Sequence, residues 1–444
     1  MHEHLEAIYK ELEQKYSYQT EYLQSVYEFL ESISDVILED PKIIESNIIR
    51  NLVEPDRIIT FKVPWEDDQG RQHINTGYRV QFNQALGPYK GGLRFTPNVN
   101  ESILKFLGFE QTFKNSLTGI PLGGAKGGSD FNPKRKTDQE ILRFCRSYMI
   151  ELHKYLGPHM DVPAGDIGVS GKLVGYMYGM YKRLTNQHEG AFTGKGTNYG
   201  GSLARTEATG YGLIYIVLAA LDAYLKTDLN DKTVIISGSG NVALHTGYKA
   251  QSMGAKVVAM SSMDGVIHHA TGIDVSFLED IKDNNESIEK YIERYPSAIF
   301  AKDPKRIWEI KCDIALPCAT ENELDLDDVK KLVKNGVKLI AEGANMPTTL
   351  DATHYLMDND VLFIPGKAAN AGGVSVSGLE MQQNATHTSW DFETVDKKLQ
   401  DIMINIFNDI YKTASDYGFP KDLVKGANIL SFKRVYQAML DQGL

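Results

Sequence analysis

Residues 233–262, TVIISGSGNVALHTGYKAQSMGAKVVAMSS, decide the fold of the second half of the chain. An apolar, β-branched run ends in a G-x-G-x-x-A pattern, which opens a helical stretch and leads to a second apolar run. In that setting Gly238 permits a tight turn, and Gly240 lets the backbone approach a pyrophosphate beside a helix N-terminus. An ordinary strand-to-helix turn is the alternative. The pattern predicts a dinucleotide-binding turn that comprises Gly238, Ser239, Gly240, Asn241 and Val242.

The short apolar runs that follow this turn indicate a parallel sheet. CDIALPC, VKLIAEGAN and DVLFIPG, which begin at residues 312, 337 and 360, each end in turn residues. Strands that alternate with helical stretches are typical of parallel sheets joined by crossover helices. A glycine- and asparagine-rich stretch, GKGTNYGGSLART, precedes this region and places a domain boundary near residue 200.

The first half of the chain has a different pattern. Residues 1–55 show helical periodicity, and residues 57–82 alternate between apolar and polar side chains as strands do. Glycine-rich segments follow, and we expect them to be loops around two helices. The last apolar stretch is amphipathic and is expected to pack on this first domain. The predicted domains are residues 1–200 together with the helix 424–444, and residues 201–423.

Three lysines of the first domain stand in unusual settings. Lys90 in GPYKGGLRF and Lys126 in PLGGAKGGSDFNP each precede Gly-Gly, and Lys114 lies in an apolar stretch. Glycine lets the backbone come close to a ligand, and clustered amines attract a dianionic substrate. At ~8 Å and an effective dielectric of ~20, each neighbouring charge is worth roughly 2 kcal/mol, or about 1.5 pKa units. We therefore expect one lysine to supply a neutral amine; three unrelated solvated lysines are the alternative.

A carboxylate lies in a stiff, nearly apolar segment, DVPAGDIGVSG. Asp166 in this segment is a candidate proton carrier, with an Asx turn as the alternative. Asp161 directly precedes Val-Pro and is typical of turn chemistry. The segment is therefore a second candidate part of an acid–base site.

Late in the chain, PGKAANAGGVSVSGLEMQQN gathers small and polar residues before a helix. Asn370 and Ser377 lie in this segment, whose small residues permit either a close approach to a substrate or close packing. His268 and His269 have no spacing typical of metal ligands, and we expect both at the surface.

The composition excludes several functional classes. A net charge of -11 over 444 residues, without a long basic run, argues against a nucleic-acid partner. Cys145, Cys312 and Cys318 lack metal-ligand spacing, so we expect reduced thiols and no metal site. The N-terminus is charged from its second residue, and the apolar stretch 213–225 is too short to span a bilayer. We expect a cytoplasmic protein without a membrane partner, in which this stretch is a buried core helix.

The motifs resemble those of one enzyme family. The segments that carry the resemblance are GPYKGGLRF, FEQTFKNSLTGIPLGGAKGGSDFNP, DVPAGDIGV, FTGKG, GGSLARTEATGYG, SGSGNVA, AEGANMPTT and PGKAANAGGVSVSGLEMQQN. In order and spacing they are similar to the glutamate dehydrogenases of the short hexameric class, within the Glu/Leu/Phe/Val dehydrogenases. The resemblance implies an α/β fold with an α/β substrate domain and a Rossmann-like dinucleotide-binding domain separated by a cleft. It also implies self-association as a homohexamer.

The resemblance implies reversible oxidative deamination of L-glutamate to 2-oxoglutarate and ammonium with NADP(H). Lys126 would be the catalytic lysine of low pKa, and Asp166 would shuttle the proton. The implied substrate-binding residues are Lys90 and Ser377 for the side-chain carboxylate, Gln111 and Lys114 for the α-carboxylate, and Thr193, Arg205 and Asn370. The implied cofactor-binding residues are Thr209, Asn345, Ser261 and Ser262, together with the turn at 238–242.

The end of the second strand of the dinucleotide region decides the cofactor prediction. Ser261 and Ser262 stand where an acidic residue would bond the ribose 2′-hydroxyl of NAD, and Asp264 follows in a turn. Because hydroxyls can donate to a phosphate, we predict NADP. The functional alternative is an NAD-linked or dual-cofactor enzyme. The structural alternative is that both serines only cap the turn.

Two other functions compete with this prediction. The first is a dehydrogenase of apolar amino acids, which has no use for a cation at the side-chain end, so Lys90 with Ser377 argues against it. The second is a non-catalytic dinucleotide-binding sensor, which we would expect to have lost Lys126 or Asp166; both residues are present.

Overall fold

The structure is a computed structural model that describes residues 1–443, and the chain forms two compact units. The first unit comprises Met1–Leu203, Ser377–Val395 and Asn428–Leu444, and the second comprises Ala204–Val376 and Asp396–Ala427. The sequence placed Ser377–Val395 in the second domain. That assignment is corrected because the segment bonds within the first unit, for example through Glu380 to Lys195 at 2.6 Å. Leu444, the end of the predicted last helix, lies outside the described residues.

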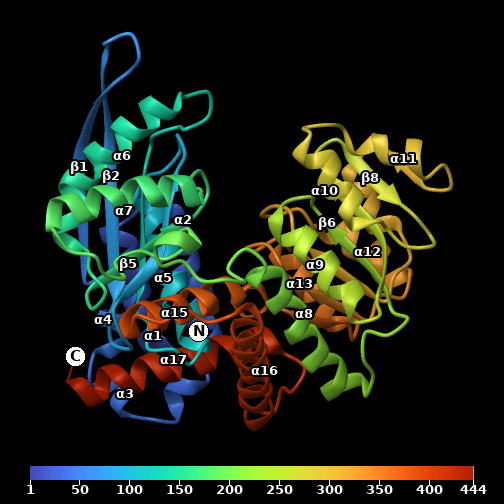
Figure 1. Ribbon diagram of the computed structural model, residues 1–444. Helices are drawn as coiled ribbons and strands as arrows, with labels where there is room; N and C mark the ends of the chain where they lie inside the picture. Colours follow the sequence, from blue (N-terminus) through green and yellow to red (C-terminus); the bar gives the residue numbers. More distant parts are fainter. Residues whose placement is uncertain (444) are drawn as a thin grey trace. The chain divides into compact units, whose positions relative to one another are not determined.

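The first unit is built on a five-stranded mixed sheet of order β1-β2-β4-β3-β5 (Figure 1). Its strands are β1 (Arg57–Glu66), β2 (Gln72–Asn83), β3 (Tyr89–Phe95), β4 (Gly124–Ser129) and β5 (Asp161–Gly165). β2 runs antiparallel to both β1 and β4, whereas β3 runs parallel to both β4 and β5. The predicted strands over residues 57–82 are therefore confirmed as β1 and β2.

Strands β3, β4 and β5 correct the expectation of glycine-rich loops. A Cβ on Gly91 would lie 1.6 Å from the carbonyl oxygen of Ala125, and one on Gly128 would lie 2.1 Å from that of Arg94. Neither glycine has a positive φ. These glycines are present because adjacent strands approach too closely for a side chain, which is one recognised use of glycine within a strand. As a consequence, Lys90 and Lys126 are fixed on sheet strands.

Helices cover both faces of this sheet. α6 (Asp138–Leu152) and α7 (Gly171–Thr185) bury one face, in a core that includes Leu93, Phe95 and Phe144. α5 (Glu101–Leu117) packs on β2 and β4 at the other face and also contacts α2. The remaining helices that lie wholly in the unit are α1 (Glu3–Lys15), α2 (Thr20–Ser32), η1 (Val36–Leu38), α3 (Lys42–Glu45), α4 (Ile48–Val53), η2 (His153–Tyr155) and η3 (Thr197–Tyr199).

Three long helices contain residues of both units: α15 (Gly372–Thr386), α16 (Phe392–Asp416) and α17 (Leu423–Gln442). Within the first unit, α17 packs through polar as well as apolar contacts. Asn428 Nδ2 donates to Ser32 Oγ at 3.0 Å, and Arg434 Nη1 donates to the carbonyl of Ser116 at 2.9 Å. The C-terminal part of the chain thereby caps the end of α5.

The second unit is built on a seven-stranded sheet of order β12-β11-β10-β6-β7-β8-β9 (Figure 1). Its strands are β6 (Thr233–Ser237), β7 (Lys256–Ser262), β8 (Gly265–His268), β9 (Ile299–Ala301), β10 (Ile314–Pro317), β11 (Leu339–Ala341) and β12 (Leu362–Ile364). The five strands from β12 to β7 are parallel, as predicted. β8 and β9 are antiparallel additions that were not predicted, because strands of three or four residues are too short to show an alternating pattern.

The order of strands reverses at β6, which pairs with β7 on one side and with β10 on the other. Such a switch point leaves a crevice at the carboxyl ends of the two strands, where open α/β sheets bind their ligands. α8 (Ala208–Ala220), η4 (Leu221–Leu225) and α9 (Asn241–Ser252) lie on one side of the sheet, and η6 (Pro304–Glu309), α12 (Leu326–Lys334) and α13 (Leu350–Asp358) bury the other. The remaining helices are α10 (Val275–Asp283), η5 (Ile288–Lys290), α11 (Tyr291–Arg294) and α14 (Gly366–Ala369).

α8 and η4 form one apolar helical stretch, Ala208–Leu225, that is longer than the sequence indicated. Its 18 residues have a mean hydropathy of 1.5, which by length and composition is enough to cross a membrane. However, 56% of the stretch is buried within the structure, and it packs on α9. This is the arrangement of a core helix, as predicted.

The histidine pair is not entirely at the surface. His269 is buried, and its ring nitrogens bond to Thr271 Oγ1 at 2.8 Å, Ser297 Oγ at 3.2 Å and Tyr291 Oη at 3.2 Å. The expectation of two surface histidines is therefore wrong for His269, whose partners lie up to 28 residues away in sequence.

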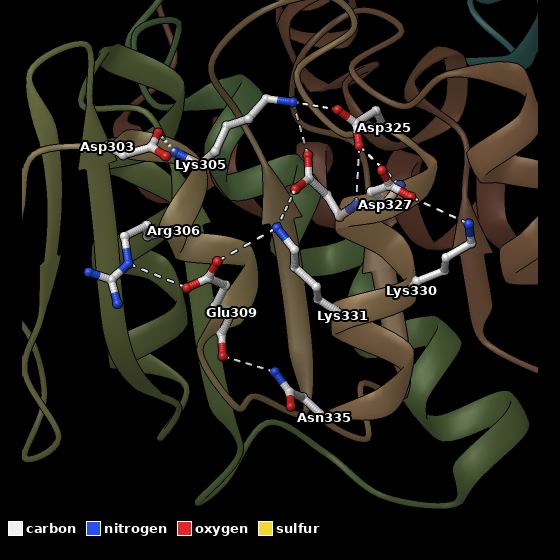
Figure 2. Close-up of polar contacts among 10 residues, drawn as sticks. Asp303, Lys305, Arg306, Glu309, Asp325, Asp327, Lys330, Lys331 and Asn335 are labelled. Carbon is white, nitrogen blue, oxygen red and sulfur yellow. Dashed lines mark hydrogen bonds and ion pairs between the residues drawn. The ribbon is translucent and has the colours of Figure 1, made fainter.

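A charged network holds α12 against η6 (Figure 2). Asp328 is almost fully buried, and its carboxylate lies 3.1 Å from Lys305 Nζ and 3.4 Å from Lys331 Nζ. The Asp325 side chain caps the helix by accepting from the backbone of Asp328 at 3.2 Å. Charge and cap together fix the start of α12.

Candidate active site

A buried cluster of three charged side chains lies on the first sheet. Lys126 Nζ is 2.9 Å from Asp166 Oδ2, and Arg94 Nε is 2.9 Å from the same oxygen. Only 8% of the Lys126 side chain, 17% of Asp166 and 11% of Arg94 is exposed. The Asp166 carboxylate therefore faces the charged groups of Lys126 and Arg94.

Strand register produces this cluster. Leu93 pairs with Gly127 on β4 and with Gly165 on β5, so the residues that flank these positions meet across three strands. A Cβ on Gly92 would lie 2.8 Å from Asp166 Cβ, so the glycine makes room for the carboxylate. Lys90, Gly92 and Arg94 are two residues apart along β3 and share its face.

The electrostatics of the cluster lower the pKa of both Lys126 and Asp166. Burial is the largest cause that lowers the pKa of the Lys126 ammonium; Asp166 opposes it, and Arg94 and Arg79 lower that pKa further. Burial alone would raise the pKa of the Asp166 carboxyl, but the charges of Lys126 and Arg94 outweigh it and hold that pKa well below its usual range. The direction for Lys126 agrees with the prediction, but the leading causes are burial and arginines instead of Lys90 and Lys114.

Asp161 also differs from its interpretation as a turn residue. It is fully buried at the start of β5, and its carboxylate accepts from Arg79 Nε at 2.9 Å and from Gln81 Nε2 at 2.8 Å. Arg79 Nη1 also donates to the carbonyl of Gly91 at 3.2 Å. This ion pair fixes β5 against β2 and β3 beneath the cluster.

Two of the other predicted substrate residues, Lys90 on β3 and Gln111 on α5, are linked through one amide. Lys90 is buried, whereas Gln111 and Lys114 are half-buried on α5. Asn115 donates to the carbonyl of Lys90 at 3.0 Å and accepts from Gln111 Nε2 at 2.6 Å. The structure therefore brings these predicted residues to the face of the sheet that carries Lys126.

Thr193 and Ser377 are buried polar residues of the first unit. The Thr193 backbone donates to the carbonyl of Pro163 at 3.0 Å, and among the described residues its hydroxyl has no hydrogen-bond partner. Glu380, one turn after Ser377, accepts from the backbone of Gly194 at 2.9 Å and from Lys195 Nζ at 2.6 Å. Glu380 of α15 thus holds in place the loop that contains Thr193.

The dinucleotide turn has the geometry that the sequence predicted. Gly238 has a φ of 91°, which a residue with a side chain rarely adopts. A Cβ on Gly240 would meet nothing within 4 Å, so the surrounding chain leaves its backbone open. α9 begins at Asn241, and its unsatisfied N–H groups and dipole suit a pyrophosphate. Ser239 and Val242 are half-buried beside this turn.

The end of β7 is organised differently from the prediction. Ser261 is buried and its hydroxyl accepts from the Gly238 backbone at 3.0 Å, so it braces the turn. The Ser262 hydroxyl donates to the Asp264 carboxylate, which also accepts from Ser287 and from the Ile288 backbone. Burial alone would raise the pKa of Asp264, but its hydrogen bonds outweigh it and lower that pKa. An ionised carboxylate therefore stands near the end of β7.

Two loops beyond β11 and β12 carry the remaining predicted residues. Asn370 Nδ2 donates to Asn345 Oδ1 at 2.9 Å, and among the described residues the buried Asn370 Oδ1 has no partner. Glu342 clamps both loops, because it accepts from the backbones of Thr348 at 3.2 Å and Gly366 at 2.6 Å. Burial raises the pKa of Glu342 to about 7.

Arg205 and Thr209 lie at the start of the second unit, Thr209 within α8. A Cβ on Gly373 would come within 2.8 Å of Thr209 Oγ1 and 3.6 Å of Arg205 Nη1. Gly373 belongs to α15, so the segment predicted as a small-residue loop is largely helical. Its neighbour Gly372 allows close packing, since a Cβ there would lie 2.0 Å from the carbonyl of Ala208.

Sequence reasoning missed several residues that shape these sites. Arg94 lies in GPYKGGLRF, and its even spacing from Lys90 is the signal that places both side chains on one face of a strand. Asn115, Glu342 and Glu380 gave no local signal, because their partners come from distant segments.

Known proteins share this chain's sequence and fold. Residues 55–183 match the family described as "Glu/Leu/Phe/Val dehydrogenase, dimerisation domain", and residues 200–443 match "Glutamate/Leucine/Phenylalanine/Valine dehydrogenase". An NAD-specific glutamate dehydrogenase of Bacteroides fragilis is 51% identical over 99% of both chains. An NADP-specific glutamate dehydrogenase of Haemophilus influenzae is 50% identical over 99% of this chain and 98% of its own.

A crystal structure of Plasmodium falciparum glutamate dehydrogenase superposes with a TM-score of 0.96 at 47% identity, covering 99% of this chain and 95% of that one. The two family matches cover most of the residues, and the relatives align over almost their full lengths. The chain therefore belongs to the Glu/Leu/Phe/Val dehydrogenase family.

Proposed function

We propose that the protein is a glutamate dehydrogenase. The reaction converts L-glutamate, water and an oxidised nicotinamide dinucleotide to 2-oxoglutarate, ammonium, the reduced dinucleotide and a proton. The observation that carries the proposal is the buried contact of 2.9 Å between Lys126 Nζ and Asp166 Oδ2, on the same sheet face as Lys90. The relatives named for glutamate support the choice of substrate.

In this mechanism Lys126 and Asp166 move the protons. Neutral Lys126 takes a proton from the water that attacks the imine carbon, and its ammonium form then stabilises the carbinolamine oxygen. Asp166 accepts a proton from the substrate amino group and returns it to the amino nitrogen of the carbinolamine. As the C–N bond breaks, the departing ammonia takes the hydroxyl proton and leaves as ammonium, and Lys126 releases its proton to solvent. The bound dinucleotide would supply the hydride acceptor. The lowered pKa of Lys126 supports its role as a neutral amine, and the lowered pKa of Asp166 keeps its carboxylate ionised before the proton transfer.

The substrate carboxylates need cations and hydrogen-bond donors. We assign Lys90 and Ser377 to the side-chain carboxylate and Gln111 and Lys114 to the α-carboxylate. The buried hydroxyl of Thr193, which has no hydrogen-bond partner in the described part of the chain, supports a further substrate contact. From the second unit, Arg205 and Asn370 are proposed substrate contacts. Thr209, Asn345 and the turn at 238–242 are proposed for the dinucleotide.

The cofactor preference follows from the end of β7. The prediction of NADP assumed that Ser261 and Ser262 were available to a phosphate, but their hydroxyls bond to Gly238 and Asp264. The Asp264 carboxylate would accept from a ribose 2′-hydroxyl and repel a 2′-phosphate. We therefore propose NAD, the alternative left open by the sequence, as the preferred cofactor. Relatives of both specificities are equally similar, so this choice rests on Asp264.

The decisive experiment measures the initial rate of absorbance loss at 340 nm with 2-oxoglutarate and ammonium, using NADH and NADPH in parallel. We expect turnover with both and a higher kcat/KM with NADH. Asp264→Asn should lower the ratio of the kcat/KM with NADH to the kcat/KM with NADPH. Faster turnover of 2-oxoisocaproate than of 2-oxoglutarate would instead indicate a dehydrogenase of apolar amino acids, and retained turnover in Lys126→Ala would contradict the mechanism.

We further propose a cytoplasmic homohexamer. The match of residues 55–183 to a dimerisation domain supports self-association. The three free, buried cysteines fit a reducing compartment. Sedimentation of the purified protein tests the assembly, and a stable monomer would contradict it.

A further inference from the structure

Asn115 occupies a fully buried position on α5 and uses its whole side-chain amide. Its Nδ2 donates to the carbonyls of Lys90 at 3.0 Å and Gly123 at 2.6 Å. Its Oδ1 accepts from Gln111 Nε2 at 2.6 Å. A primary amide is the side chain that offers two N–H donors and an acceptor in this geometry.

The three partners of Asn115 belong to three segments that carry proposed substrate contacts. Gln111 lies one turn earlier on α5, where Lys114 is the direct neighbour of Asn115. Lys90 lies on β3, and Gly123 directly precedes β4, three residues before Lys126. The amide therefore joins the proposed cradle for the α-carboxylate, the proposed cation for the side-chain carboxylate and the strand that carries the catalytic lysine.

We propose that Asn115 is a positioning residue that sets the spacing between the two carboxylate sites and so selects the chain length of the dicarboxylate. This inference rests on the proposed function. Adding or removing one methylene moves the second carboxylate by roughly 1 Å, a displacement large enough to cost about a hundredfold in rate. The bonds from Asn115 hold α5 and β3 at a fixed separation, so loss of these bonds relaxes that discrimination.

The test compares 2-oxo dicarboxylic acids of four, five and six carbons as substrates of reductive amination: oxaloacetate, 2-oxoglutarate and 2-oxoadipate. Asn115→Asp keeps the acceptor for Gln111 but places an oxygen against the carbonyls of Lys90 and Gly123. We expect its preference for the five-carbon acid, as a ratio of kcat/KM values, to fall at least tenfold. The KM for the dinucleotide should stay within twofold. Asn115→Ser provides a second, uncharged variant in case the aspartate prevents folding.

Ser116→Ala is the matched control. Ser116 is equally buried on α5, and among the described residues its hydroxyl bonds only to the carbonyl of Phe113 within the helix, at 2.7 Å. The preference of Ser116→Ala for the five-carbon acid should equal that of the wild type. If both Asn115 variants lose activity by the same factor for all three acids, or keep the wild-type ratio, the inference is overturned. If the wild type reduces none of the three acids, the proposed function fails instead.

Discussion

Arg94 donates through Nε to Asp166 Oδ2 at 2.9 Å, and this is the oxygen that Lys126 also approaches. Arg94 thereby places a permanent positive charge beside both partners of the proposed acid–base pair. Its charge lowers the pKa of Lys126 and that of Asp166. Arg94 therefore contributes, beside burial, to the pH at which the pair can work.

Replacing Arg94 should move the pH dependence of activity. Without the guanidinium the pKa of Lys126 rises, so its neutral form appears at higher pH. In Arg94→Met we expect the acidic limb of the kcat/KM profile to shift upward by about one pH unit. Activity at neutral pH should fall by up to about tenfold, the largest change that a shift of one pH unit produces. Arg94→Lys, which keeps a charge, should shift the limb less, and an unshifted limb in Arg94→Met would contradict this role.

The dinucleotide turn was predictable because its determinants are local. The positive φ of Gly238 and the helix start at Asn241 follow directly from neighbouring residues. Strands β3 and β4 were not predictable in the same way. Gly91 is a glycine because Ala125 lies against it, and that contact joins segments 34 residues apart, which no local pattern reveals.

The candidate site shows the same division between local and distant causes. Lys90 and Lys126 stand out because each directly precedes Gly-Gly, and Asp166 stands out because it lies in a nearly apolar, glycine-containing segment. The side chains that hold them do not, since Asn115 bonds across 25 residues and Glu380 bonds across 185. The fold brings these partners together, so their roles became visible only with the structure.

The ion pair of Lys195 and Glu380 should be essential for stability as a pair. Both side chains are almost fully buried and lie 2.6 Å apart. Glu380→Gln leaves an uncompensated buried ammonium, so we expect a loss of about 3–5 kcal/mol in the free energy of unfolding. The double variant Lys195→Met with Glu380→Gln should recover part of that loss. Denaturant titration followed by circular dichroism measures both.

An exposed pair gives the control for this prediction. Lys397 and Asp401 lie 2.7 Å apart, but more than half of each side chain is exposed. Lys397→Met should change stability little, because exposed pairs contribute at most about 1 kcal/mol. Equal losses in the free energy of unfolding for Lys397→Met and Glu380→Gln would show that burial does not decide how much these ion pairs stabilise the protein.

The helix α12 carries one buried and one exposed carboxylate, and Figure 2 labels the exposed one, Asp327. Asp328 contacts Lys305 and Lys331 with 3% of its side chain exposed, whereas Asp327 contacts Lys330 with 85% exposed. Asp328→Ala should lower the free energy of unfolding by about 1–3 kcal/mol, because it strips two lysines of their buried partner. Asp327→Ala should leave stability within about 0.5 kcal/mol of the wild type. Similar melting temperatures for the two variants would contradict the importance of burial here.

Glu342 should make stability depend on pH in an unusual direction. Burial raises the pKa of its carboxyl to about 7 in the folded chain, against an ordinary value of 4.5. The folded state thus holds the proton more tightly, so this stability is complete below pH 4.5 and is lost as the pH rises through 7. The free energy of unfolding of the wild type should decline between pH 5 and pH 8. In Glu342→Gln, thermal unfolding should show that this decline is smaller than in the wild type by up to about 3 kcal/mol. The exposed Glu321→Gln should keep the wild-type slope. An unchanged slope in Glu342→Gln would mean that another group titrates in this range.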